Sequence, residues 1–161
     1  MTTIPLVYSF WFMLAAYVVH IIDESLLGGS FVEKVKQHWW PQYSWRKFFW
    51  FNAAYLTLMA ASIVLYDRIG SRLVFLPLAW SIERFFNAIW HVWWTVHFRE
   101  YSPGLLTSLL ILIESYWIAF CRPAAQLLPL ASIWPGVVLG MLAAAFLSFY
   151  MPIVARRFSG R

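Results

Sequence analysis

The chain contains five long apolar stretches with few charged residues, and this feature limits its fold more than any other. Each stretch supplies roughly the 20 residues that a helix needs to cross the hydrocarbon core of a bilayer. Because no water is present there to bond with the backbone, such stretches form helices. We therefore expect an all-α integral membrane protein, a single bundle over residues 1–161. The expected spans are residues 5–27, 48–66, 72–98, 103–121 and 133–155, with four or six spans as alternatives.

Composition and charge agree with a membrane protein. Hydrophobic residues make up 62% of the chain and charged residues 12%, which is too apolar for a soluble domain. The single cysteine, Cys121, excludes an internal disulfide and a cysteine-rich metal site. Eight Lys and Arg residues fall on one side of the expected spans and three on the other. This asymmetry predicts an N-terminus outside and a C-terminus inside, and it explains the basic charge without a nucleic-acid partner.

Two further segments have a simpler expected role. Residues 28–47 alternate basic and aromatic side chains, which is typical of an anchoring belt at the headgroup level. The alternative is a lip that gathers lipid or gates its entry, and His38 belongs to this segment and not to a metal site. In the last span, small residues recur every fourth position and predict close helix packing. They are Gly136, Gly140, Ala144 and Ser148.

Several ionisable or polar side chains lie inside the expected spans, where each costs about 2.5–3.5 kcal/mol unless it is paired. His20, Asp23 and Glu24 share one helical face of the first span. His91 lies about as far from the inner end of the third span as His20 does from that of the first, roughly 10 Å below the membrane boundary. The two imidazoles are therefore expected to meet. Glu114 is expected about 6 Å deeper, and Glu83 deeper again, too far to share the same centre.

This pattern favours a metal site. A histidine and a carboxylate four residues apart on a helix can hold zinc or iron from one face, and His20 and Glu24 have this spacing. His91 would add a second nitrogen, which leaves positions open for catalysis. We expect Asp23 to act as a general base or to orient a ligand, and Asn87 to orient the substrate.

Other residues are candidates for substrate binding or proton movement. The guanidinium of Arg84 suits an anionic lipid head. Ser102 precedes Pro103 and is expected to cap the next helix, whose free N–H groups could bind an oxyanion or phosphate; the alternative is a plain capped helix start. Glu83 and Glu114 are expected to support the ligands or to belong to a proton relay.

Three short motifs in this order resemble the HXXEE domain family of small, mostly bacterial integral membrane proteins. They are HIIDE at residues 20–24, NAIWH at residues 87–91 and YSPG at residues 101–104. The resemblance implies an enzyme active site without an assigned reaction, in a bacterial cytoplasmic membrane. It also implies that the site contains His20, Asp23, Glu24, Asn87 and His91. Asp23 stands where the family motif has Glu, and the shorter side chain argues against direct metal binding at this position.

The function expected from these observations is that of a metal-dependent membrane enzyme, hydrolytic through an activated water, with a lipid-like or apolar substrate. Three alternatives remain open. The same residues could form a proton relay in a proton-coupled transporter. An iron pair that also uses Glu114 and Glu83 would make an oxidase or hydroxylase. The aromatic-rich surface also suits a structural subunit of a membrane complex, and the chain could form a homo-oligomer in contact with membrane lipids.

Overall fold

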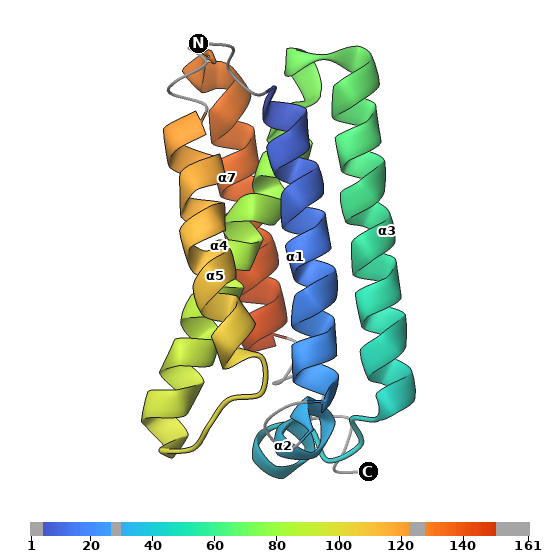
Figure 1. Ribbon diagram of the computed structural model, residues 1–161, viewed down its shortest axis with the longest axis vertical. Coiled ribbons are helices and arrows are strands. Elements are labelled where there is room, and N and C mark those ends of the chain that lie inside the picture. Colours follow the sequence, from blue (N-terminus) through green and yellow to red (C-terminus); the bar gives the residue numbers. More distant parts are fainter. Residues whose placement is uncertain (1–4, 27–29, 123–127, 151–161) are drawn as a thin grey trace.

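The computed structural model describes residues 5–26, 30–122 and 128–150, and every regular element in this part of the chain is helical. Five long helices lie side by side, and the short helix α2 lies at one end of them (Figure 1). The helices are α1 (Leu6–Leu26), α2 (Phe31–His38), α3 (Trp45–Ile69), α4 (Phe75–Phe98), α5 (Leu105–Tyr116) and α7 (Leu130–Ala145). Short turns of 3₁₀ helix (Ser71–Leu73) and π-helix (Trp117–Cys121 and Phe146–Tyr150) complete the described chain.

The expected membrane-protein architecture is supported by helix length and composition. Three helical segments are long and apolar enough to cross a bilayer: Leu6–Leu26, Trp45–Ile69 and Leu130–Ser148. The helix α4 has 24 residues but carries several ionisable groups, and the apolar segment Leu105–Cys121 is shorter. Each predicted span overlaps one helix. The basic tail, the segment 123–127 and the end of the last predicted span lie outside the described residues.

Close contact between α4 and α7 depends on glycine. A Cβ atom on Gly140 would lie 2.5 Å from the carbonyl oxygen of Ala79, and one on Gly136 would lie 2.7 Å from that of Phe75. No larger residue fits at this distance, so the packing role predicted for these small residues is confirmed. The helix α4 also contacts α3 and α5, while α1 contacts α3 and α5.

The segment that follows α1 does more than anchor the protein at the surface. The ring centroid of Trp39 lies 4.2 Å from that of Trp94 and 5.0 Å from that of Trp90, both on α4. Tyr43 and Phe48 are buried in the same aromatic core. These rings therefore cover one end of the helix bundle, which an anchoring belt at the headgroup level does not require. His38 is hydrogen-bonded to Glu100, as expected for a residue outside the metal site.

Candidate functional site

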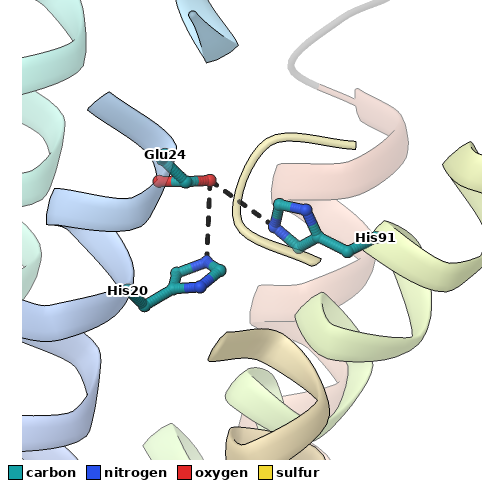
Figure 2. A group of neighbouring side chains, drawn as sticks. All are labelled: His20, Glu24 and His91. Atoms are coloured by element: carbon teal, nitrogen blue, oxygen red, sulfur yellow. Dashed lines mark ion pairs between the residues drawn. The ribbon is translucent and has the colours of Figure 1, made fainter. Parts of the chain in front are cut away.

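Two histidines and a glutamate converge between α1 and α4 (Figure 2). The Oε1 atom of Glu24 lies 3.6 Å from Nε2 of His20 and 3.5 Å from Nε2 of His91. The three side chains are buried, with 1% of His20, 5% of Glu24 and 0% of His91 exposed. The imidazole centroids are 4.9 Å apart, so the prediction that these two rings meet is confirmed.

Two of the three distances in this group suit a small divalent cation, and all three candidate ligand atoms lie within 4.8 Å of one another. Zinc binds nitrogen and oxygen at about 2.0–2.2 Å, so two ligand atoms at tetrahedral corners lie about 3.3–3.6 Å apart. The two measured distances agree with this value. Among the described residues, neither Nε2 atom has a hydrogen-bond partner. A buried polar atom without a partner costs about 1–3 kcal/mol, so both rings have unused hydrogen-bonding capacity where they face Glu24.

The opposite side of His20 is fixed by a hydrogen-bonded chain to Asp23. The Nδ1 atom of His20 lies 2.8 Å from Oγ1 of Thr107, which donates to Oδ2 of Asp23 at 2.7 Å. The hydroxyl has one proton, and its other close neighbour, the carbonyl of Gly104, is also an acceptor. The proton on Nδ1 must therefore belong to His20, and Nε2 carries the lone pair that a metal requires. Metal-binding histidines commonly have such an outer partner.

Asp23 also binds the start of α5. Its Oδ2 accepts a hydrogen bond from the backbone N–H of Thr107 at 3.2 Å, in the first turn of that helix. The first turn has free N–H groups and favours a negative charge. A carboxylate from α1 thus accepts one backbone N–H of this helix start, and the predicted binding of an oxyanion there stays a prediction.

The expectation that Ser102 caps this helix is wrong. The residue before α5 is Gly104, and the Ser102 hydroxyl instead lies 2.9 Å from Nδ1 of His91. The reason is the positive φ of +88° at Gly104, which turns the chain so that Ser102 faces α4. Ser102 thus contacts a candidate ligand, while its predicted contact with substrate stays a prediction.

Gly104 also packs directly against the three converging side chains. A Cβ atom there would lie 2.8 Å from Cγ of Glu24 and from Cε1 of His20, and 3.2 Å from Cε1 of His91. Sequence reasoning missed this role and that of Thr107. The sequence signal that could have indicated the role of Gly104 is its position between Pro103 and an apolar helix.

The lining of a cavity of about 230 Å³ includes Glu24 from α1 and Asn87, Glu83 and Arg84 from α4. The Arg84 guanidinium donates to both carboxylate oxygens of Glu83, at 2.6 Å and 2.9 Å. The central carbon of the Arg84 guanidinium, Cζ, lies 4.3 Å from the ring centre of Tyr17. The charges of Glu83 and Arg84 are therefore matched inside the protein. Glu83 does not belong to the His20–Glu24–His91 group, in agreement with its predicted depth. A substrate contact of Arg84 stays a prediction.

Glu114 is also separate from this group. It lies two helical turns beyond Thr107 on α5, on the same face. Its Oε1 atom is buried and has no hydrogen-bond partner among the described residues. Its predicted role in a relay stays a prediction.

Comparison with known proteins identifies the family. The model of a family described as proteins of unknown function with an HXXEE motif matches residues 11–119, more than half of the chain. The protein therefore belongs to the HXXEE family, and the resemblance inferred from its motifs is confirmed. No match was found among curated proteins or among solved structures.

The structure gives the three polar positions of the motif a physical role in this chain. The first and fifth residues of the motif, His20 and Glu24, lie one helical turn apart and face His91. The fourth, Asp23, binds Thr107 and does not belong to the converging group. Its shorter side chain is consistent with this role, because it contacts α5 and not the inward-facing nitrogens.

Proposed function

We propose that His20, Glu24 and His91 bind one divalent metal ion, zinc or iron, and that the protein is a metal-dependent hydrolase of the membrane. The observation that supports this most strongly is that two buried imidazole Nε2 atoms and one carboxylate oxygen converge, and neither nitrogen has another partner in the described chain. A metal ion with three protein ligands supplies a Lewis acid and a water of lowered pKa.

The residues around the ligands would give the site its rigidity. Asp23 and Thr107 hold the His20 ring in one tautomer, and Ser102 holds the His91 ring. Asp23 keeps one carboxylate oxygen, Oδ1, without a partner among the described residues. That oxygen is the candidate proton acceptor, so Asp23 combines the orienting role with the proposed role of a general base.

The adjoining cavity supports an apolar substrate. It lies among aromatic side chains and includes Glu24 and Asn87 in its lining. Asn87 lies one helical turn from His91 and would orient the substrate. We further propose five membrane crossings, an external N-terminus and a bacterial cytoplasmic membrane, which the charge asymmetry and the family motifs support.

A proton relay in a transporter is the second candidate. It is favoured by the hydrogen-bonded chain from His20 through Thr107 to Asp23, which could pass a proton between helices. An iron-pair oxidase has less support, because Glu83 and Glu114 lie outside the converging group.

Metal content measured by plasma mass spectrometry tests the proposal. The protein would be purified in detergent without a histidine tag. We expect about one zinc or iron per chain, lost in the His20→Ala/His91→Ala variant. The matched control is His97→Ala, which changes an exposed histidine of α4 outside the group and should keep the metal. Failure of the folded wild type to retain or rebind either metal would overturn the proposal.

Activity separates the two candidate functions. A hydrolase would cleave an aryl ester only with its metal and would recover when zinc or iron is added back. A relay would give pH-driven proton flux in liposomes with no metal bound, and that result would favour the second candidate.

A further inference from the structure

The cavity next to Glu24 has a distinctive wall. Nine of its 17 lining residues are aromatic, which favours flat apolar groups that can stack against rings. Phe31 and Trp39 contribute from the segment over the bundle end, and Trp90 contributes from α4. A ligand in this cavity would thus lie between the covering aromatic segment and the bundle itself.

The polar groups of the cavity differ in whether they already have partners. Asn52 accepts a hydrogen bond from the Tyr17 hydroxyl and donates to the backbone of Phe48. Glu83 and Arg84 bind each other. By contrast, neither the Asn87 amide nor the Tyr55 hydroxyl has a hydrogen-bond partner in the described part of the chain. The second carboxylate oxygen of Glu24 points away from both histidines (Figure 2).

Two groups of the cavity lining therefore have unused hydrogen-bonding capacity, the Tyr55 hydroxyl and the Asn87 amide, and Asn87 lies one helical turn from the candidate ligand His91. An amide N–H of Asn87 is a donor for a carbonyl oxygen. The charges of the paired Glu83 and Arg84 cancel. A divalent ion would be balanced by the two carboxylates of Glu24 and Asp23 together. The lining consequently favours a ligand without net charge.

The volume limits the size of that ligand. A buried cavity of about 150 Å³ binds benzene, and sites for drug-sized molecules begin at about 300 Å³. The volume of about 230 Å³ lies between these values and suits one or two rings. The cavity is partly open, and a phospholipid with two acyl chains is too large to be enclosed in it.

We propose that this cavity binds small neutral carbonyl compounds, esters or amides, with the carbonyl at Asn87 and a flat apolar body among the aromatic side chains. This inference rests on the proposed function, because it places the bond that hydrolysis would cleave beside the metal ligands.

Photolabelling with benzophenone tests the ligand class. Benzophenone is neutral, has two rings and one carbonyl, and under near-ultraviolet light adds a nearby C–H bond across that carbonyl. The full chain would be irradiated in detergent and its peptides mapped by mass spectrometry. We expect labelling of the peptide that contains Trp90 to exceed labelling at Trp134, which is 60% exposed on α7 and reports simple partitioning.

Competition and substitution sharpen the test. Phenyl benzoate, a neutral ester with two rings, should suppress the cavity label, while phosphatidylcholine should not. Asn87→Leu should lower the label about fivefold, the effect of one lost hydrogen bond, with labelling at Trp134 unchanged. Cavity labelling no greater than at Trp134, or equal suppression by both competitors, would overturn the inference, and both results need only the wild type.

Metal content measured on the same samples separates this inference from the proposed function. Bound metal without cavity labelling would overturn the ligand class and leave the metal site intact. Selective labelling without any metal would overturn the proposed hydrolase and support the ligand class alone.

Discussion

Glu24 and Glu83 line the same cavity and are both buried, yet their surroundings differ. Glu83 accepts two hydrogen bonds from Arg84, the next residue along the chain. Glu24 faces two imidazole nitrogens that have no partner in the described residues. A buried carboxylate whose charge is matched within the chain has a structural explanation. A buried carboxylate that faces nitrogens without partners has no such explanation among the described residues, and this difference separates a structural pair from a candidate site.

Removing Arg84 should give the largest effect on stability. Arg84→Met leaves Glu83 buried without a counter-charge, which costs about 3–5 kcal/mol in the free energy of unfolding. The Glu83→Gln/Arg84→Met double variant should recover most of that loss. Glu24→Gln should change the stability of metal-free protein by less than about 1 kcal/mol. Unfolding in mixed detergent, followed by circular dichroism, would measure all three. Equal losses for Arg84→Met and Glu24→Gln would remove the proposed contrast.

An alanine methyl group at position 104 should disturb the His20–Glu24–His91 group specifically. Gly70 provides the control for zinc binding, because nothing lies within 4 Å of an atom added there. Its φ of +93° and ψ of −161° fall in a region essentially restricted to glycine, so Gly70→Ala should lose about 1–3 kcal/mol from backbone strain. Gly104 has a φ of +88° and a ψ of −3°, and Gly104→Ala should lose about 1–2 kcal/mol from strain and about 1–3 kcal/mol from overpacking. Only Gly104→Ala should weaken zinc binding, which zinc titration beside thermal unfolding would check; equal zinc affinity of the two variants would contradict the packing of Gly104 on the imidazoles.

Thr107→Val tests whether the outer partners of His20 matter. It removes the hydroxyl between His20 and Asp23 with little change in shape, and should weaken metal binding about 10–100-fold. Thr57→Val is the control, because that exposed hydroxyl bonds only to Ala53 of its own helix. Competition with a chelating dye would give both affinities. An unchanged affinity in Thr107→Val would show that the hydrogen-bonded chain does not support the ligand.

The smallest expected effect concerns the loop between α4 and α5. Partial burial raises the pKa of the Glu100 carboxyl, but hydrogen bonds from Trp94, Lys34 and His38 lower it by more, so its pKa lies below the ordinary value. The stabilisation is therefore present above the pKa of the unfolded state, about 4.3, and is lost as the pH falls through the lower folded-state value. Because the group is partly exposed, we expect less than about 1 kcal/mol.

Unfolding measured between about pH 6 and pH 3 would check this effect, with Glu100→Gln as the reference. The wild type should lose its small advantage over the variant in acid. A constant difference between the two across this range would contradict the role of the carboxylate.

Helix geometry explains which parts of the site could be predicted from sequence. The rise per residue is fixed, so counting from the ends of two spans placed His20 and His91 at one depth. The same rule separated Glu83 from them. The four-residue spacing put His20 and Glu24 on one face, and these predictions are confirmed by their contacts.

Contacts between helices and backbone turns could not be predicted in the same way. The hydrogen bonds of Asp23 to Thr107 depend on how α1 and α5 are rotated, which the pattern of one helix does not fix. The position of Ser102 depends on the positive φ of Gly104. The sequence around Trp39 predicted only a surface anchor, because the rings that pack against it, Trp90 and Trp94, lie far along the chain.

The bond between Asp23 and the start of α5 has a consequence for how the protein is made. Synthesis proceeds from the N-terminus, so α1 reaches the bilayer before α4 and α5 exist. At that stage its polar face has neither His91 nor Thr107 beside it, and unsatisfied polar groups in hydrocarbon cost several kcal/mol. The polar face of the first helix therefore has all of its described partners only after α5 has been inserted. A chain interrupted before residue 105 would contain the complete first motif and His91 but not Thr107, which binds Asp23.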